Sequence, residues 1–377
     1  MNQDIVLNVN NREYTFWKKI NIRRSLRNIC GSFYFEAMDN ISSKFLDLGF
    51  KIGHSCTIKY RNTVLLEGYI DEFNVNYTKD THTIQLGGRD KTCDLVDCSY
   101  VPYSVTALNK VSEWKGQPLE AIIRQLCSAF QIEVVVDANT TNEARSDIQS
   151  KGNDAKFETF KTEGETVAEL ITKICLTRAI LPVCYGDGKL TLTRAGDKRA
   201  KDNLSLGDNI LQGNLIQSNK DRYSHYTIKG QGIGIDSLDQ VDYLRPKAER
   251  EDTVMSRSRY RPTIILAETI TDNAKCSERA AWEYSTRVGE SRKVEYTVQD
   301  WVQYDAKTIW PLNGLVVIND SLLGIEKEML ITDLLFSFDK DTGKTTKITV
   351  EDPNAYKLLE TPLSVGFPLD LNINEEN

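Results

Sequence analysis

Polar and apolar residues alternate through most of the first hundred residues. The segment IVLNVNNREYTFW, which starts at Ile5, follows this period and contains a turn signal at Asn10-Asn11. Further alternating segments follow at short intervals: GSFYFEA, CTIKY, NTVLLEGYIDEFNVNYT and THTIQLGG. A period of two places every second side chain on one face of a β-strand. Because the turns between these strands are close, the pattern predicts a β-meander or a small barrel.

The period becomes helical after Tyr103. In QPLEAIIRQLCSAF one helical face carries Leu119, Ile122, Ile123, Leu126, Cys127 and Phe130. Adding 48 to the first five numbers gives a second such face, Val167, Leu170, Ile171, Ile174 and Cys175. An apolar segment follows each helix, so we expect two related helix–strand units. We also expect a capping box formed by Thr162 and Glu165, and a hairpin turn at Asp187-Gly188.

Alternation returns in the last third of the chain. Strands are expected around Tyr223 to Lys229 and in KVEYTVQDWVQ, LVVIND, EMLITDLLFSFD and KTTKITVED, with a helix in TDNAKCSERAAWEYSTRVGES. Gly230 to about Pro262 is expected to be a long irregular stretch, and DKDTGKTT a hairpin turn rather than a calcium loop, because its spacing departs from that of an EF-hand.

These patterns predict an α+β, multi-domain chain with two β-barrel-type domains separated by small α/β helix–strand units. The first β-barrel domain is expected at residues 1–98, and the two small α/β units at 99–155 and 156–205. The second β-barrel domain, with a long loop and a helix, is expected at 206–360, and an extended tail at 361–377. A length of 377 residues agrees with several cores rather than one.

Composition narrows the class of function. Hydrophobic residues make up 40% and charged residues 27% of the chain, which is typical of a folded protein. The net charge of −7 argues against a dedicated nucleic-acid binder. We see no signal peptide and no apolar stretch long enough to cross a membrane, so we expect eight reduced cysteines and no membrane insertion.

No catalytic or cofactor motif fits its required spacing. GGRDK lacks the second glycine of a phosphate loop, and we expect its strand to end at Leu86 in a glycine turn, before a short segment that buries Cys93, Leu95 and Val96. KGQGIGID has Ile235 where a dinucleotide fingerprint needs glycine. Cys93, Cys98 and His82 do not have zinc-site spacing. We therefore expect no enzyme activity, no cofactor and no metal ion.

One basic cluster is a candidate interface. Tyrosines and acidic residues interrupt it, so it fits an acidic protein neighbour better than a nucleic acid. Its residues, together with one aromatic residue of the tail, are the candidate interface residues: Arg245, Lys247, Arg250, Arg257, Arg259, Arg261 and Phe367.

The ordered set of segments resembles a known family. LLEGYIDEFNVNY, IQLGGRDKTCDLVDCS, KGQPLEAIIRQLCSAFQIEVVVD, DRYSHYTIKGQG, RAAWEYSTRVGES and the region from YTVQDW to DPNAY together are similar to the baseplate hub proteins of Mu-like contractile-tailed phages. The resemblance extends from about Ile5 to Tyr356, and no single motif decides it.

The resemblance implies a homotrimer in which each chain supplies two similar barrels to a ring of approximately sixfold character. That ring would join the tail tube, or other baseplate proteins, to the central spike protein in the virion, after assembly in the host cytoplasm. Genomic DNA would pass without specific binding, and we expect surplus carboxylates to face the channel. The alternatives are a secretion-system or tailocin spike hub, a peptidoglycan-binding or lytic tail component, and a DNA-binding loop.

Overall fold

The computed structural model describes residues 4–38, 49, 51–79, 82–101, 113–114, 116–137, 156–157, 160–161, 164–176, 180–196, 198–231, 246–270 and 273–356. Predictions that fall elsewhere, among them the tail, Arg245 and the Thr162 cap, lie outside the described residues. The described part is mostly β-sheet with a few helices, as the alternating patterns predict.

The first β unit, which we call the N-terminal module, is a set of seven antiparallel strands. Their order in the sheet is β3-β4-β7-β6-β5-β1-β2. The strands are β1 (Ile5–Val9), β2 (Arg12–Tyr14), β3 (Lys19–Ser25), β4 (Ser32–Met38), β5 (Ser55–Tyr60), β6 (Thr63–Tyr77) and β7 (His82–Asp90). Alternate side chains point into an apolar core, as the period of two requires.

The second β unit, the C-terminal module, uses strands far apart in the sequence. Its main path is β16-β20-β23-β22, and β21 pairs with both β22 and the short β15. The strands are β15 (Leu204–Ser205), β16 (Ile210–Gln217), β20 (Arg292–Gln299), β21 (Leu315–Asp320), β22 (Ile325–Asp339) and β23 (Gly343–Glu351). The expected hairpin turn in DKDTGKTT is confirmed, because β22 and β23 pair from Asp339 opposite Gly343 onward.

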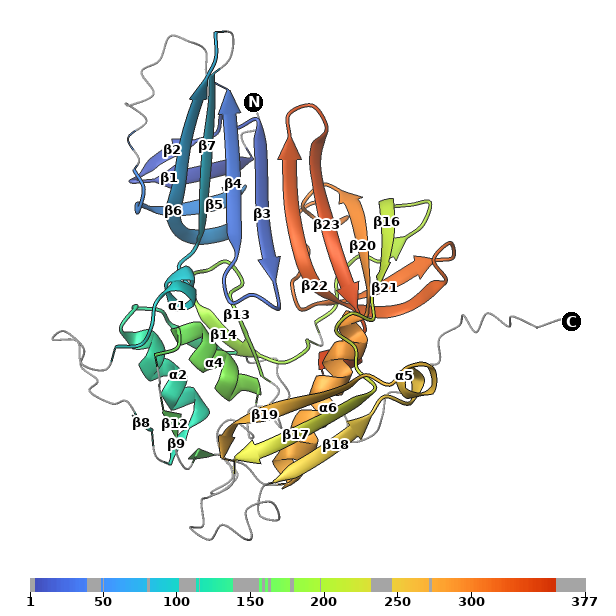
Figure 1. The fold of residues 1–377 in the computed structure, drawn as a ribbon. Coiled ribbons are helices and arrows are strands. Elements are labelled where there is room, and N and C mark those ends of the chain that lie inside the picture. The colour runs from blue at the N-terminus through green and yellow to red at the C-terminus, as the bar shows by residue number, and fades with distance from the viewer. Residues whose placement is uncertain are drawn as a thin grey trace, which may run out of the picture.

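The two modules share one sheet, because β22 of the second pairs with β3 of the first. The strands from β6 to β16 therefore follow one another across the upper half of Figure 1. One apolar cluster runs through both modules. Among the described strands no pairing joins the two ends of this sheet, so the expected closed barrels are not confirmed.

The modules also repeat each other. The order β3-β4-β7-β6-β5 in the first matches β16-β20-β23-β22-β21 in the second, with the same antiparallel pairings. In each module a 15-residue strand, β6 or β22, forms a hairpin with the next strand. Each long strand has a bulge in that hairpin, at Asp71 in β6 and at Thr332 in β22. The two modules therefore match both in strand order and in the position of a β-bulge.

The helix–strand region lies below the N-terminal module (Figure 1). Its two helices, α2 (Leu119–Ser128) and α4 (Val167–Leu176), are the two predicted 48 residues apart, and their predicted inward faces share one core. The three-stranded sheet β10-β14-β13 packs on them, with the expected turn between its last two strands. The strands are β10 (Val134–Val136), β13 (Leu181–Val183) and β14 (Leu190–Thr193). Two short pairs complete the region: β8 (Glu113–Trp114) with β12 (Phe160–Lys161), and β9 (Gln117–Pro118) with β11 (Lys156–Phe157).

A reciprocal cap begins α4, four residues beyond the predicted one. Thr166 N donates to Glu169 at 2.9 Å, and Glu169 N donates to Thr166 Oγ1 at 3.2 Å. Thr166 and Glu169 therefore form the capping box just before the first helical turn.

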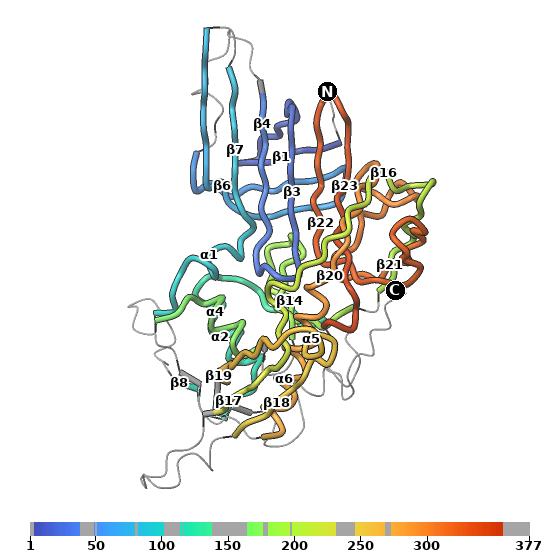
Figure 2. Tube along the Cα trace, turned by 45° about the vertical axis from the view of Figure 1, so that its right-hand side comes forward, coloured from blue at the N-terminus to red at the C-terminus, as the bar shows by residue number. Residues whose placement is uncertain are grey.

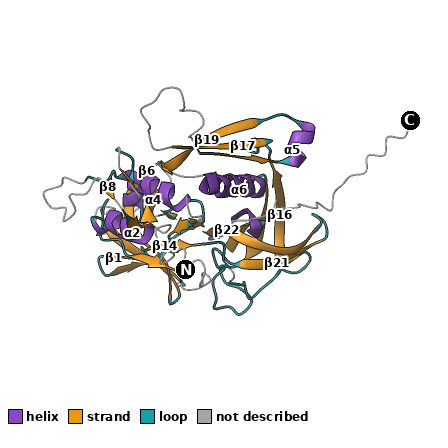
Figure 3. Cartoon of the chain, turned by 90° about the horizontal axis from the view of Figure 1, so that it is seen from below, coloured by secondary structure: helices purple, strands orange, loops and turns teal. Residues whose placement is uncertain are grey.

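The lower sheet has the order β18-β17-β19, and helix α6 lies between it and the C-terminal module (Figure 3). The elements are β17 (His225–Gln231), β18 (Lys247–Glu251), α5 (Thr253–Ser258), β19 (Pro262–Ile270), α6 (Asn273–Glu290) and the 3₁₀ helix η3 (Pro353–Tyr356). The prediction of an irregular stretch up to Pro262 is wrong, because this stretch contains β18 and α5.

The expected glycine turn after Leu86 is also wrong. Strand β7 continues through Gly87 and Gly88 to Asp90, and the short helix α1 (Cys93–Asp97) follows, with Cys93 and Leu95 buried. The second glycine permits close approach of the neighbouring strands at the bulge in β6. A Cβ atom on Gly88 would lie 2.1 Å from the carbonyl oxygen of Tyr69 and 2.4 Å from the ring of Phe33.

We predict that Gly88→Ala lowers the free energy of unfolding by about 2–3 kcal/mol, because the added methyl group meets backbone and a buried ring. Gly87→Ala is the matched control, since its Cβ would come no closer than 3.5 Å to any neighbouring atom. Urea unfolding of the three proteins measures both effects. Equal midpoints for Gly88→Ala and Gly87→Ala would contradict this account of the motif.

Candidate assembly interface

The joint between the modules is an antiparallel ladder of β22 with β3. It runs from Asp333 opposite Ser25 to Asp339 opposite Lys19. On its inner face Phe336 lies opposite Ile22, and both side chains are fully buried. The ladder thus pairs backbone groups that would otherwise form two exposed sheet edges, and it merges the two apolar cores.

A buried polar cluster closes the lower end of the joint. Arg27, which follows β3, donates from Nη2 to both carboxylate oxygens of Glu351 at 2.6 and 2.5 Å, and from Nε to Tyr356 at 3.2 Å. Its Nη1 lies 3.1 Å from Glu290 at the end of α6. Glu351 is 1% exposed, and burial raises the pKa of its carboxyl against the opposing effect of Arg27. One arginine therefore links both modules to α6.

A second cluster closes the upper end. Lys344 Nζ, in β23, donates to the Tyr60 hydroxyl at 2.9 Å and to Asp4 at 3.2 Å, and it lies 3.5 Å from Asp300. The Trp301 ring packs on Tyr60 with their centroids 5.3 Å apart. Both ends of the ladder are thus fixed by contacts between side chains of the two modules.

We predict that Arg27→Met lowers the free energy of unfolding by about 2–4 kcal/mol, because it leaves the Glu351 carboxylate buried without its cation. Arg23→Met is the matched control on the same joint, since Arg23 is 59% exposed and its pair with Asp333 contributes at most about 1 kcal/mol. Chemical unfolding compares the two variants. A loss for Arg23→Met as large as that for Arg27→Met would contradict a special role for the buried cluster.

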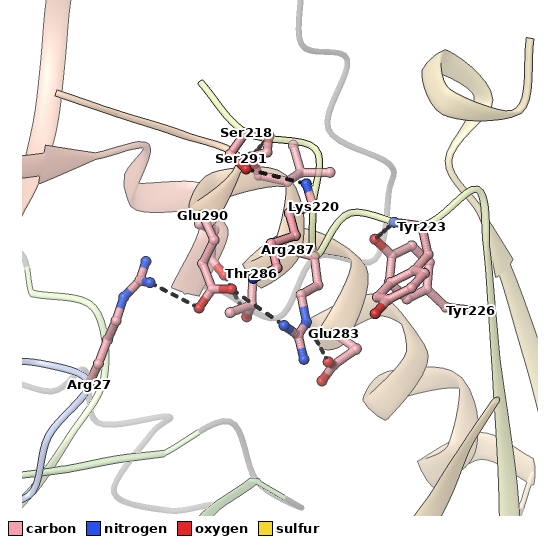
Figure 4. Close-up of polar contacts among 12 residues, drawn as sticks. Arg27, Ser218, Lys220, Tyr223, Tyr226, Glu283, Thr286, Arg287, Glu290 and Ser291 are labelled. Atoms are coloured by element: carbon pink, nitrogen blue, oxygen red, sulfur yellow. Dashed lines mark hydrogen bonds and ion pairs between the residues drawn. The ribbon is translucent and has the colours of Figure 1, made fainter. Parts of the chain in front are cut away.

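Helix α6 carries a further charge network around the buried Glu283, and Figure 4 shows the contact of Glu283 with Arg287. Glu283 accepts from Arg279 Nη1 at 2.5 Å and from Arg287 Nε at 2.9 Å, one helical turn away on either side. Burial of Glu283 favours its neutral form, but the two arginines outweigh burial and hold the pKa of this carboxyl below its usual value. The network stabilises the segment of α6 that packs on the lower sheet.

The lowered pKa of Glu283 predicts that the stability of the protein depends on pH. The ionised Glu283 carboxylate contributes to stability above the unfolded-state pKa of about 4.5, and this contribution is lost as pH falls through the lower folded-state pKa. We therefore predict that Glu283→Gln is less stable than the wild type at neutral pH and loses less stability on acidification. Thermal unfolding across this pH range is the measurement. Glu120→Gln, which removes an exposed pair with Arg124 on α2, is the control. Parallel pH profiles for the wild type and Glu283→Gln would contradict the assignment.

The predicted basic cluster is not one free patch. Arg261 donates to the carbonyl oxygens of Asn219 and Lys220 and stacks on Tyr223. Arg250 lies over the Tyr284 ring, and Lys247 pairs with Glu249 in the same strand. The exposed Arg257 and Arg259, at the end of α5, have no ion pair among the described residues. Arg245 and Phe367 lie outside the described residues.

Several edges of the shared sheet have no neighbour among the described strands, among them those of the short β2 and β15, and two of these edges are longer. One is the outer edge of β16, the last strand on the side of the C-terminal module. The other is the far half of β6, residues 72–77, which pairs with β7 on one side only. Val75 is 37%, Tyr77 78% and Leu211 58% exposed along these two edges. Figure 2 shows β6 rising with β7 beyond the rest of the module.

Sequence reasoning did not find several of the residues that fix the assembly of the modules. Arg27, Glu351 and Lys344 lie in segments where no local pattern distinguishes them from surface charges. The same holds for Arg222 and Asp252, whose buried ion pair at 2.6 Å joins α5 to the start of β17. Their importance comes from partners distant in the sequence.

Other kinds of site are scarce in the described part of the chain. There, no three His, Cys, Asp or Glu side chains gather in a way that could hold a metal ion, and no helix has the length and apolarity to cross a membrane. All eight cysteines are free thiols, six of them buried. Burial raises the pKa of thiols such as Cys127, to about 12, which agrees with inert core residues.

Three family models match successive parts of this architecture. The model described as Mu phage baseplate assembly protein GpP-like, N-terminal, covers residues 4–90, and that of the baseplate hub protein gp44-like second domain covers 92–194. The fourth domain of Mu phage baseplate assembly protein GpP covers 272–359. A crystal structure of the 43 kDa tail protein of prophage MuSo2 from Shewanella oneidensis is 32% identical, with a TM-score of 0.77, over 93% of this chain and 99% of that one. The chain belongs to the Mu-like baseplate hub family.

One further relative agrees with this membership, and a second shows the same fold. Baseplate hub protein gp44 of Escherichia phage Mu is 28% identical over 356 residues, which are 93% of this chain and 88% of that protein. The tail protein from Neisseria meningitidis MC58 is 20% identical over 93% of this chain and 98% of that one, with a TM-score of 0.75, and shows the shared fold. The three family models together cover the N-terminal module, the helix–strand region, α6 and strands β20 to β23.

Proposed function

We propose that this chain is a non-enzymatic, structural subunit of a phage tail baseplate hub. Three copies close a ring that joins the tail tube to the central spike protein and leaves a channel for DNA. Membership of the hub family supports the baseplate role. The ring is what the family resemblance implies, and the repeat of the N- and C-terminal modules within one chain supports it.

One observation carries this proposal: two modules of equal topology are joined side by side within one chain. In each module the long strand, β6 or β22, lies toward one side. The strand at the other side is β3 in the first module and the equivalent β16 in the second. A contact between unlike sides of a repeated unit is head-to-tail, and it produces a closed ring when its rotation closes. Three chains would place six modules around such a ring.

The polar face of the shared sheet is the surface that we propose lines the channel. Its side chains alternate with the buried ones and carry charges of both signs in the strands from β6 to β16. The basic residues are Lys19, Arg23, Arg89, Lys293 and Lys347, and the acidic residues include Glu36, Glu67, Asp71, Glu72, Glu295, Asp333 and Asp339. A face that carries both signs does not collect phosphates as a basic surface would. That surplus carboxylates face the channel stays a prediction.

The mass and shape of the purified protein test the proposal. We predict particles of three copies of 42.8 kDa, about 128 kDa in total, with threefold symmetry and a central hole. Mass photometry and negative-stain electron microscopy at high protein concentration measure both properties. Compact particles of a single copy would contradict the ring, and retention on purified peptidoglycan would then favour a lytic or wall-binding tail component instead.

A further inference from the structure

We propose that the C-terminal tail, residues 361–377, lies on the outer face of the lower sheet of the same chain. Its apolar side chains would cover three exposed residues at and before strand β19, Tyr260, Ile264 and Leu266, which we call the apolar stripe. This contact goes beyond the proposed ring and does not depend on it.

The lower sheet has one covered and one open face. Helix α6 packs on the inner face, where Ile228 and Ala267 share an apolar cluster with Ala280 of the helix (Figure 3). Side chains of the outer face alternate with these along β19. There, Ile264 is 62% and Leu266 69% exposed. Strand β19 therefore presents apolar side chains to water on the face opposite α6.

Tyr260 extends this stripe beyond the start of the strand. It is 76% exposed, and its ring lies edge-on to that of His225, with the two centroids 5.5 Å apart. His225 pairs with Pro262 and belongs to the same outer face. From Tyr260 to Leu266 the stripe is about 20 Å long. Contiguous exposed apolar side chains mark surfaces that another segment or molecule covers.

The tail has the sequence pattern of a strand with one apolar face. Every second residue from 363 to 373 is apolar: Leu363, Val365, Phe367, Leu369, Leu371 and Ile373. The residues between them are small or polar: Ser364, Gly366, Pro368, Asp370 and Asn372. In an extended chain, a period of two places all the apolar side chains of such a segment on one side. Covering that side with an apolar surface removes it from water.

The described residues end close to the apolar stripe. The 3₁₀ helix η3 packs on the last turns of α6, where Thr286 Oγ1 donates to its backbone at 3.1 Å. In the same turns Val288 shares an apolar cluster with Tyr226 of β17, which pairs with Thr263 of β19. Residues 357–362 span at most about 20 Å when extended. This length is enough to bring the apolar part of the tail to the outer face.

The charges of the tail and of the stripe are complementary. From residue 358 to 377 the chain has acidic and no basic side chains: Glu360, Asp370, Glu375 and Glu376. Exposed cations lie at both ends of the stripe. Arg257 and Arg259, which form no ion pair within the described part of the chain, precede Tyr260, and Lys229 pairs with Leu266 in the ladder. Opposite charges of this kind favour the orientation of a docking segment more than they add to its affinity.

Linkage favours the tail of the same chain over other occupants. A short tether holds a segment near its site at an effective concentration on the order of millimolar. Another copy of the chain must first lose its translational and rotational freedom to bind the same stripe. The cover should therefore form in the single chain and should not depend on protein concentration.

Alkylation of a cysteine placed in the stripe tests the cover. Leu266→Cys is made in a Cys98→Ser background, which removes the exposed native thiol, both in the full chain and in a chain that lacks residues 361–377. We expect iodoacetamide to alkylate residue 266 at least about 10-fold more slowly in the full chain, because the thiol reacts only when the tail is detached. Mass spectrometry of the peptide that contains residue 266 measures the rate.

Matched variants separate this cover from a general change in the fold. Phe367→Ser in the full chain should increase the alkylation rate of residue 266, whereas Asn372→Ala, on the polar side of the tail, should leave it unchanged. Leu322→Cys, at a site that is 80% exposed between β21 and β22, should react equally fast with and without the tail. Thermal unfolding of each variant before the reaction verifies its fold.

Two outcomes would overturn the proposal. Equal alkylation rates of residue 266 in the full and the shortened chain would show that the tail does not cover the stripe. Slow alkylation that appears only at high protein concentration would assign the cover to another copy of the chain. The particle mass of both chains tests the proposed ring separately, so failure of the cover and failure of the ring are distinguishable.

Discussion

Strands β3 and β22 come from opposite ends of the chain, and the ladder between them determines how everything else is arranged. It turns two sheets with open edges into one, and it joins their apolar cores. At the lower end of the ladder Arg27 donates to Glu351, from which it is separated by 324 residues in the sequence. Because Arg27 also contacts Glu290, the end of α6 is fixed by the same contact. The lower sheet then takes its position from α6.

Ordering distant segments costs backbone entropy that local contacts alone do not offset. The joint offsets this cost with buried apolar side chains and with a carboxylate held by one arginine and one tyrosine hydroxyl. A buried ion pair contributes little net stability relative to an apolar substitute, but it strongly disfavours arrangements that leave the charge unpaired. The cluster is thus better suited to select one relative position of the modules than to stabilise them.

Local patterns predicted most strands and the helices α2, α4 and α6, because residues such as Ile20, Ile22 and Leu170 follow the periods of two and 3.6. They failed where tertiary contacts override local preference. Lys247 to Glu251 lies in the stretch that was expected to be irregular, yet it is a strand because it pairs with β17. Gly87-Gly88 resembles a turn, but the close neighbouring strands require it inside β7. The joint itself was not predictable, since a local sequence pattern does not indicate which distant strand will pair with β3. Arg23 and Asp333, which form an ion pair across the joint, are 310 residues apart.

The two modules repeat one strand order, and a single kind of contact, the ladder of β22 with β3, joins them within the chain. Two such modules on separate molecules would lose translational and rotational freedom when they associate, and linkage within one chain avoids this loss. The joint therefore forms as the chain folds and does not depend on protein concentration. Because its geometry is fixed in this way, a buried contact as demanding as that of Arg27 with Glu351 can form in every copy of the chain.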